Sequence, residues 1–368
     1  MYLNGENIPQ NYQEALKWYQ LSANQGIAEA QYNLGAMYLN GQGIQTDYSL
    51  ALKWTKLAAL QNFAAAQSNL GSIYLDGLGI STNYSEAFQW FELAANQGFY
   101  VAQYNLGVIY AQGLGLQQDY KKTLHWFKLA AKQGYAAAQN NIGEMYFHGR
   151  GVQQSYQEAL NWFQLAAHQE YPNSQYNIGV MYAQGLGVQQ DLQKAFILYT
   201  LAARQGFKSA QHNLGNIYLN GYGIQKDYQE ALYWFQLSAE QGHPDSQHNL
   251  AIMYSQGIGV LQDYQQTLTW YNLAANQGYP NSQYNLGYMY LHGKGVSQNY
   301  QKASQLFKLA AEQGYANAQY NLAVMYLNKQ AIQSDTSEAL HWLELAAQQG
   351  HSNARAALQV IYEKETKH

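Results

Sequence analysis

The sequence predicts an all-α fold, a solenoid built from 36-residue helix-turn-helix repeats. A motif returns every 36 residues without insertion or deletion, and a fixed period of this length is typical of repeat proteins. Apolar residues recur at helical spacing in two segments of each period, with a Gly-x-Gly turn between them. The motif is first seen in full at residues 30–35, and its copies begin at Ala30, Ala66, Ala102, Ala138, Ser174, Ala210, Ser246, Ser282, Ala318 and, in degraded form, Ala354.

The two helical segments of a period are called helix A and helix B here. In helix A, Ala30, Leu34 and Met37 share one face, and Gly41 and Gly43 follow as a turn. Helix B, for example residues 156–167, carries a wide apolar stripe. A stripe of this width suits a helix that is packed between two neighbours.

Each helix B is preceded by a residue that can cap it. Asp, Asn and Ser side chains accept hydrogen bonds from the free backbone N–H groups of a first turn. The ten caps are Asn11, Asp47, Asn83, Asp119, Ser155, Asp191, Asp227, Asp263, Asn299 and Asp335. Five repeats add a glutamate three residues later, which predicts reciprocal capping boxes at Glu14, Glu86, Glu158, Glu230 and Glu338.

Three positions predict packing because the same kind of residue fills them in repeat after repeat. The position of Gly35 accepts only Gly or Ala, and we expect helix B alanines such as Ala51 to face it. One helix A position is Tyr in all eleven copies, from Tyr2 to Tyr362. All eight tryptophans share one helix B position, and we expect both aromatic columns to be buried: Trp18, Trp54, Trp90, Trp126, Trp162, Trp234, Trp270 and Trp342.

The phase of the motif divides the chain into one continuous array over residues 1–368. Residues 1–27 form a partial repeat, and because they begin inside an expected helix A they suggest a truncated N-terminus. Nine full repeats follow over residues 28–351. Residues 352–368 form a capping helix with a charged tail, after a turn at residues 329–331 that has lost both glycines.

Composition excludes several classes of function. The net charge of −4 provides no basic surface for a phosphate backbone, so we expect no nucleic acid partner. The absence of cysteine excludes disulfides and thiolate chemistry. No run of about 18 apolar residues exists to insert into a membrane, and the first residues do not form a signal peptide.

The pattern A-x-A-Q-Y-N-L-G-x-M-Y-x-x-G-x-G-V-x-Q-D-Y-x-x-A-L-x-W-F-x-L-A-A-x-Q-G resembles the Sel-one-like repeat (SLR), a relative of the tetratricopeptide repeat (TPR). The resemblance covers nearly the whole chain. It implies a right-handed superhelical α-solenoid that acts as a non-catalytic adaptor between proteins. It also suggests a bacterial envelope or host-interaction factor, exported or periplasmic, although this chain contains no signal peptide. Cysteine-rich members of the family carry disulfides in each repeat, and this chain has none.

The same resemblance assigns the concave, partner-binding face to helix A. Two adjacent columns of the motif lie there, one mostly Tyr or His and one Asn, and an amide can both donate to and accept from a peptide. The predicted binding residues are Tyr32, Asn33, Tyr104, Asn105, Glu144, Tyr176, Asn177, His212, Asn213, His248, Asn249, Tyr284, Asn285, Tyr320 and Asn321. An equally weighted alternative is that the Asn column bonds neighbouring helices.

Variable positions on helix A predict an apolar, almost uncharged groove for a protein or peptide segment. The alternative is that some of them are half-buried between repeats. The first set is Ala36, Ser72, Val108, Glu144, Val180, Asn216, Ile252, Tyr288 and Val324. The second set is Leu39, Leu75, Ala111, Phe147, Ala183, Leu219, Ser255, Leu291 and Leu327.

Other functions have weaker support in the sequence. The Tyr, Trp, Asn and Gln surface also suits a glycan such as peptidoglycan, which is the main alternative partner. A hydrolase would need a convergent cluster of unlike groups, whereas the repeats place like groups in columns. His212 with His248 lacks a further metal ligand, and the Gly-x-Gly turns follow helices instead of strands, so we expect no metal, phosphate loop or cofactor.

Overall fold

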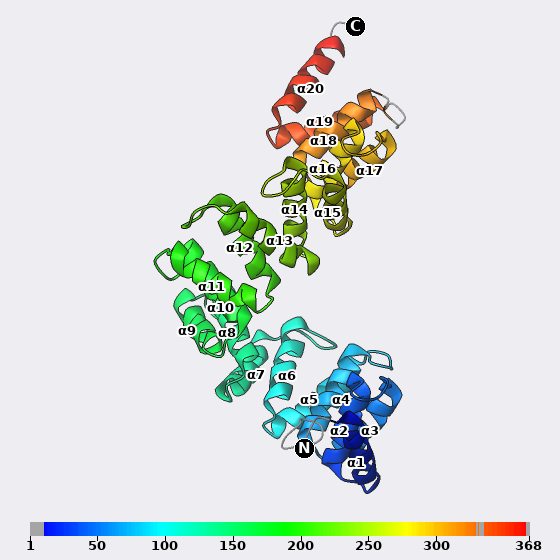
Figure 1. The fold of residues 1–368 in the computed structure, drawn as a ribbon, viewed down its shortest axis with the longest axis vertical. Helices are drawn as coiled ribbons and strands as arrows, with labels where there is room; N and C mark the ends of the chain where they lie inside the picture. Colours follow the sequence, from blue (N-terminus) through cyan, green and yellow to red (C-terminus); the bar gives the residue numbers. More distant parts are fainter. Residues whose placement is uncertain (1–10, 329, 331–334, 366–368) are drawn as a thin grey trace. The chain divides into compact units, whose positions relative to one another are not determined.

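The computed structural model describes residues 11–328, 330 and 335–365, and all regular structure in these ranges is helical. Helices alternate along the chain in the order that the sequence predicts (Figure 1). The helices B are α1 (Tyr12–Asn24), α3 (Tyr48–Leu60), α5 (Tyr84–Asn96), α7 (Tyr120–Lys132), α9 (Tyr156–Ala167), α11 (Leu192–Arg204), α13 (Tyr228–Glu240), α15 (Tyr264–Asn276), α17 (Tyr300–Glu312) and α19 (Thr336–Gln348). The helices A are α2 (Ala28–Asn40), α4 (Ala64–Asp76), α6 (Tyr100–Gln112), α8 (Ala136–His148), α10 (Pro172–Gln184), α12 (Lys208–Asn220), α14 (Pro244–Gln256), α16 (Pro280–His292), α18 (Ala316–Leu327) and α20 (Ser352–Glu365).

Consecutive helices pack in pairs, which confirms the predicted all-α solenoid. Contacts divide the chain into two compact units, Met1–Ile178 with Leu186–Val188 and Gly179–Gly185 with Gln189–His368. Each unit has the same repeat architecture. The predicted single array over residues 1–368, with its partial first repeat and C-terminal cap, stays a prediction. Residues 1–10, most of the turn that lacks glycines and the last three residues lie outside the described ranges.

The ten predicted caps of helix B are confirmed. In α5 the side chain of Asn83 accepts a hydrogen bond from the backbone N–H of Glu86 at 3.1 Å, and the other nine caps bond in the same way. The glutamates have a partner that the sequence analysis did not predict. The carboxylate of Glu86 accepts from Nε1 of Trp90 at 3.2 Å, and Glu230 and Glu338 do the same for Trp234 and Trp342.

The Gly-x-Gly turn joins each repeat to the one before it. Gly77 ends α4 in the left-handed conformation with φ +68°, and the N–H of Asn83 then donates to the carbonyl of Tyr74 at 2.8 Å. Gly79 also has a positive φ, and a Cβ placed there would lie 2.5 Å from Cβ of Tyr48 in the preceding helix B. The second glycine therefore lets the turn lie directly on the first residue of α3.

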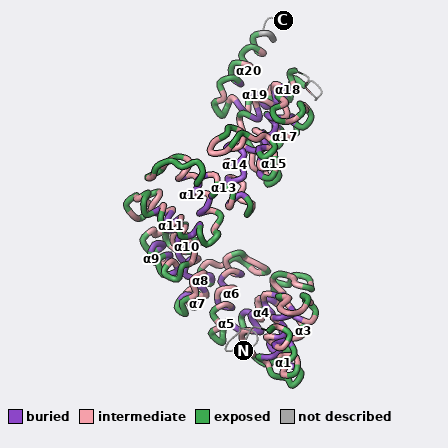
Figure 2. The backbone as a smooth tube through the Cα atoms, viewed as in Figure 1, coloured by how far each residue is buried: buried purple, intermediate pink, exposed green. Residues whose placement is uncertain are grey.

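The core runs between each helix and its neighbours along the chain, and Figure 2 colours the buried residues on these helices purple. Leu70 of α4 packs with Ala58 and Ala59 of α3, and Phe91 of α5 packs with Leu106 and Ile109 of α6. All of these residues are buried. The prediction that alanines face the glycine column is wrong for most repeats. A Cβ at Gly71 would lie 2.8 Å from the ring of Phe91, and the glycines of α6, α8, α12 and α16 face phenylalanines in the same way.

The tryptophan column is less buried than the sequence suggests. Trp234 and Trp342 are buried at 9% exposure, but Trp54, Trp90, Trp126, Trp162 and Trp270 are half-buried and Trp18 is 52% exposed. The repeated tyrosine of helix A is also mostly half-buried, with Tyr38 buried and Tyr362 exposed. The residue after the tryptophan position takes the central place instead, and it is phenylalanine at Phe91, Phe127, Phe163, Phe235 and Phe307, where its ring reaches the glycine of helix A.

A buried glutamine that the sequence pattern did not single out ties three helices together, and it stands on every helix A from α2 to α18. Nε2 of Gln67 donates to the carbonyl of Ala59 at 3.2 Å, at the end of the preceding helix B. Its Oε1 accepts from Nε2 of Gln97 at 2.7 Å, at the end of its own repeat. Both ends of the buried amide are therefore paired, as a polar group in a core requires. Equivalent pairs include Gln31 with Gln61 and Gln211 with Gln241.

The neighbouring residues Trp162 and Phe163 provide a direct test of this core. Phe163 is fully buried against Gly143, so Phe163→Ala is expected to lower the free energy of unfolding by about 3–5 kcal/mol. Trp162→Ala is expected to cost clearly less, because that ring is half-buried. Thermal and denaturant unfolding followed by circular dichroism would measure both. Equal losses would contradict the assignment of the core to the phenylalanine column.

Candidate functional site

The asparagine column of helix A is half-buried and engages neighbouring residues. Nδ2 of Asn141 donates to the hydroxyl of Tyr104 at 3.3 Å, and Nδ2 of Asn177 donates to Oδ1 of Asn140 at 3.1 Å. Asn249 donates to Asn216 at 3.3 Å, Asn285 to the hydroxyl of Tyr271 at 3.1 Å, and Asn321 bonds Tyr284. These amide nitrogens stabilise contacts between helices, while the side chains keep part of their surface in solvent. Asn33, Asn105 and Asn213 are half-buried at the equivalent places.

The tyrosine column packs its rings against two other aromatic positions. Tyr104 stacks on Phe127 of the following helix B with centroids 5.4 Å apart, and its edge meets Tyr135, which precedes the next helix A, at 5.2 Å. Tyr284 repeats this arrangement with Phe307 and Tyr315. Tyr32, Tyr176 and Tyr320 are likewise half-buried. Burial raises the pKa of Tyr104, so its hydroxyl stays protonated at neutral pH.

Two repeats replace this tyrosine by histidine, and serine then appears at a fixed distance. Nδ1 of His212 lies 2.8 Å from Oγ of Ser246, and Nδ1 of His248 lies 2.8 Å from Oγ of Ser282. Asn140 stands at the same position and bonds Oγ of Ser174 at 2.9 Å. Where this position is Tyr or Ser, the partner is Ala, as in Tyr284 with Ala318. Histidine or asparagine at this position is thus always paired with a serine hydroxyl.

The bonds of His212 define its protonation. Nδ2 of Asn216 lies 2.8 Å from Nε2 of His212, and because an amide NH₂ group can only donate, Nε2 is unprotonated. The proton on Nδ1 then points to Ser246, whose hydroxyl donates to Ser238. Burial lowers the pKa of His212 from 6.5 to about 4, helped by His243, which stacks on it at 4.6 Å. Burial lowers the pKa of His248 to about 4 as well.

Among the described residues, no three His, Asp or Glu side chains converge on a point that could hold a metal ion. Glu144 accepts a hydrogen bond from Nδ2 of Asn140 at 2.9 Å and lies at the edge of a pocket. In the same described ranges, no helix is long and apolar enough to cross a bilayer.

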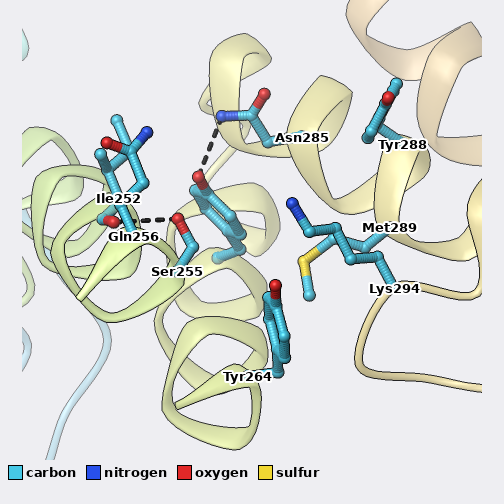
Figure 3. Close-up of a pocket in the computed structure, with 9 residues that line it drawn as sticks. Ile252, Ser255, Gln256, Tyr264, Asn285, Tyr288, Met289 and Lys294 are labelled. Atoms are coloured by element: carbon cyan, nitrogen blue, oxygen red, sulfur yellow. Dashed lines mark hydrogen bonds between the residues drawn. The ribbon is translucent and has the colours of Figure 1, made fainter. Parts of the chain in front are cut away.

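Helix A carries two equivalent pockets, one in each unit. The first, of about 220 Å³, lies between α14 and α16 above α15 (Figure 3). The second, of about 180 Å³, lies between α6 and α8 above α7. Residues that line the first pocket are Ile252, Ser255, Gln256, Tyr264, Tyr271, Asn285, Tyr288, Met289 and Lys294. Residues that line the second are Val108, Ala111, Gln112, Tyr120, Thr123, Phe127, Asn141, Glu144, Met145 and Arg150.

The pockets unite predicted and unpredicted residues. Of the predicted binding residues they contain Glu144 and Asn285. They also contain the variable positions Val108, Ala111, Ile252, Ser255 and Tyr288. Sequence analysis missed the contributions of helix B and of the Gly-x-Gly turn, which meet helix A only through the fold. One signal was available, because Arg150 and Lys294 are basic whereas most such turns carry an uncharged central residue.

These observations define the class of protein: a helical repeat protein with a half-exposed, weakly charged face along helices A. The chain belongs to the Sel1 repeat family. The family model described as "Sel1 repeat" matches residues 1–27, 28–63, 64–99, 101–135, 136–171, 172–207, 208–243, 244–279, 280–315 and 316–351. Sel1 repeat proteins are commonly protein-protein interaction scaffolds and are generally non-catalytic.

Two solved structures resemble the chain over most of its length. The protein c5321, a protective antigen present in uropathogenic Escherichia coli strains, is 32% identical with a TM-score of 0.60, covering 99% of this chain and 86% of that one. A Sel1 repeat protein from Oxalobacter formigenes is 33% identical with a TM-score of 0.61, covering 84% of this chain and 90% of that one. No curated protein sequence matches the chain.

Acidification is expected to destabilise the repeats that contain the two histidines. Their pKa in the folded state, about 4, lies below the ordinary value of 6.5, so the unfolded chain binds protons first as the pH falls. Stability is therefore lost from about pH 6.5 down to about pH 4, by up to about 3 kcal/mol per histidine. Melting temperatures at pH 7.5, 6 and 5 would measure this loss.

The array provides a matched control for this pH dependence. Replacing His212 and Ser246 by Tyr and Ala, and His248 and Ser282 likewise, installs the pair that Tyr284 and Ala318 form elsewhere. This fourfold variant is expected to remain folded and to melt with a weaker pH dependence. An unchanged pH dependence would show that other groups cause the loss.

Proposed function

We propose that the chain is a non-catalytic adaptor that binds an extended peptide or protein segment along the exposed face of helices A. The observation that carries the proposal is a series of half-exposed or exposed positions that recurs on the helices A of each unit, all uncharged except Glu144. Ala36, Ser72, Val108, Val180 and Val324 are examples, and each is half-buried. Their surface is available to a partner without unfolding a repeat.

The chemistry of this face favours a weakly charged partner segment. Helix A supplies apolar side chains at the variable positions and amides in the asparagine column. An asparagine whose Nδ2 bonds a neighbour still has carbonyl lone pairs that can accept a backbone N–H. Asn141 and Asn177 illustrate this arrangement. Half-buried tyrosines beside them are suitable anchors, because aromatic residues often dominate binding energy.

The serine–histidine pairs support a structural role over a catalytic one. Ser246 and Ser282 are fully buried, which keeps their hydroxyls away from a substrate in solvent. The hydroxyl of Ser246 also donates a hydrogen bond to Ser238, whose hydroxyl donates one to the carbonyl of Lys208. The pairs thus hold adjacent repeats together and fit an adaptor.

The likeness to c5321 extends the proposal to the setting of the protein. That protein is a protective antigen present in uropathogenic Escherichia coli strains. By analogy, this chain is an exported or periplasmic bacterial factor of the envelope that contacts another protein. A glycan such as peptidoglycan is the alternative partner, since tyrosine and amide side chains also suit sugars.

Arginine substitutions on the two faces of the array would test the proposal. Ser72→Arg with Val324→Arg places cations on helix A, in both units. This variant is expected to weaken binding to peptide arrays and to crosslinked partner proteins by about 2 kcal/mol or more, because the long charged side chains block contact with the face of helix A. Leu93→Arg with Leu309→Arg is the matched control, because these exposed leucines lie on helices B.

Circular dichroism would show that both variants keep their helices. Binding lost only in the helix B variant would refute the assignment to helix A. Binding to a peptidoglycan array with none to peptides would favour the glycan alternative and contradict the peptide proposal.

A further inference from the structure

The two pockets on helix A occupy the same place in repeats that lie four apart. Adding 144 to the number of each of nine lining residues of the second pocket yields the lining residue of the first. Val108 thus corresponds to Ile252, and Arg150 corresponds to Lys294. This agreement shows that the repeat architecture determines where the pocket lies. The side chains of a particular repeat determine whether it is open.

A small residue on helix A opens each pocket. Ala111 and Ser255 stand where other repeats have a large side chain: Leu39, Leu75, Phe147, Leu219, Leu291 and Leu327. The aromatic ring of helix B lines the pocket beneath this small residue, Phe127 in one pocket and Tyr271 in the other, and both rings remain largely buried. Ala183 is the only other small residue at this position.

Each of these two pockets is lined by a cation from a Gly-x-Gly turn. The turns of the other repeats have an uncharged central residue. Arg150 and Lys294 are the central residues of their Gly-x-Gly turns, whereas the others are Gln42, Leu78, Leu114, Leu186, Tyr222 and Ile258. The turn holds the cation in place, because Gly295 lies against Tyr264, and Nζ of Lys294 lies 5.7 Å from the centroid of that ring. Figure 3 shows the amine pointing inward between Asn285 and Tyr264.

The first pocket offers further hydrogen-bond donors near the cation. Tyr264 accepts a hydrogen bond from Nε2 of Gln262 at 3.1 Å, so its hydroxyl hydrogen can be donated to a ligand. Tyr120 is held in the same way by Gln118 at 3.0 Å in the second pocket. The walls are apolar, formed by Ile252 and the buried Met289.

The two pockets differ in charge. Lys294 is the only charged residue that lines the first pocket, whereas the second has both Arg150 and Glu144. No ion pair neutralises Lys294 within the part of the chain that the structure describes. An anion therefore gains attraction in the first pocket, and in the second the carboxylate of Glu144 opposes it.

We propose that the pocket around Tyr264, Tyr271 and Lys294 binds a carboxylate with a short apolar stem, carried by the peptide segment that lies on helix A. The inference rests on the proposed function and adds the group that is recognised. Lys294 and Tyr264 bind the carboxylate, and Ile252 and Met289 contact the stem. The volume is adequate, because a cavity of about 150 Å³ can already accept a benzene ring. The carboxylate belongs to an acidic side chain or to the end of a chain.

Methionine methyl groups in the two pockets provide separate reporters. Met289 and Met145 line the first and the second pocket, and the chain has seven methionines in all. The probes are the capped peptides Ac-Ala-Glu-Ala-NH₂ and Ac-Ala-Gln-Ala-NH₂, and Ac-Ala-Ala-Ala with a free carboxyl end. NMR titration of ¹³C-methyl-labelled protein is expected to show saturable shifts of Met289 with a carboxylate probe and much weaker shifts with the glutamine probe.

Variants drawn from the array itself sharpen the test. Lys294→Gln, the residue found at Gln42, is expected to weaken binding of the carboxylate probe roughly tenfold, in keeping with the strength of charge-assisted hydrogen bonds. Ser255→Leu fills the pocket with the residue of five other repeats and is expected to abolish the shifts. Tyr288→Glu copies Glu144 and is expected to weaken binding, whereas Glu144→Tyr is expected to strengthen it at Met145.

The outcomes separate this inference from the proposed function. Equal affinity for the glutamate and glutamine probes, or an unchanged affinity in Lys294→Gln, would overturn the carboxylate site. In that case the proposed function still stands if uncharged peptides bind helix A and lose affinity in the Ser72→Arg and Val324→Arg variant. It then stands without the carboxylate site. A response to the free chain end but not to the capped glutamate assigns the pocket to a terminal carboxylate.

Discussion

The rest of the structure depends on the close approach of helix A to the aromatic ring of the following helix B. At Gly143 there is no room for a Cβ beside the ring of Phe163, so the two helices meet at a distance that only the smallest residues permit. This contact sets the orientation of both helices in a repeat. The half-exposed positions on helix A, and the turn that lies against the preceding helix B, depend on this close approach.

The exposed face of helix A serves packing and recognition with the same residues. Asn141 bonds Tyr104 of the preceding repeat, yet it also lines the second pocket. Asn285 likewise donates a hydrogen bond to Tyr271 and lines the first pocket. Burial raises the pKa of Tyr271 to about 12. Such residues hold the surface in a fixed arrangement before a partner arrives, which reduces the conformational entropy lost on binding. The two readings of the asparagine column, structural and binding, are therefore compatible.

Substitutions that differ between repeats give individual repeats local properties that identical repeats would not have. Tyr, Ser, His and Asn occupy one helix A position, and each His or Asn brings a serine partner such as Ser246 or Ser282. At another position, loss of a large side chain at Ser255 coincides with a cation at Lys294. Both cases pair two substitutions that lie 34 or 39 residues apart in the chain but close together in the fold. Specificity can thus vary locally while the helix contacts stay constant.

The sequence by itself determined the repeat period, the helix boundaries, the caps and the glycine turns, because these depend on interactions between residues a few positions apart. Asn83 caps α5 as its residue type predicts, and Gly77 ends α4 with a positive φ. Only the tertiary structure decided that Phe163 and not Trp162 fills the core, that Gln67 bridges three helices, and that Tyr264 and Lys294 meet over one pocket. Those outcomes depend on the distance and rotation between helices, which a pattern of spacing along one chain does not specify.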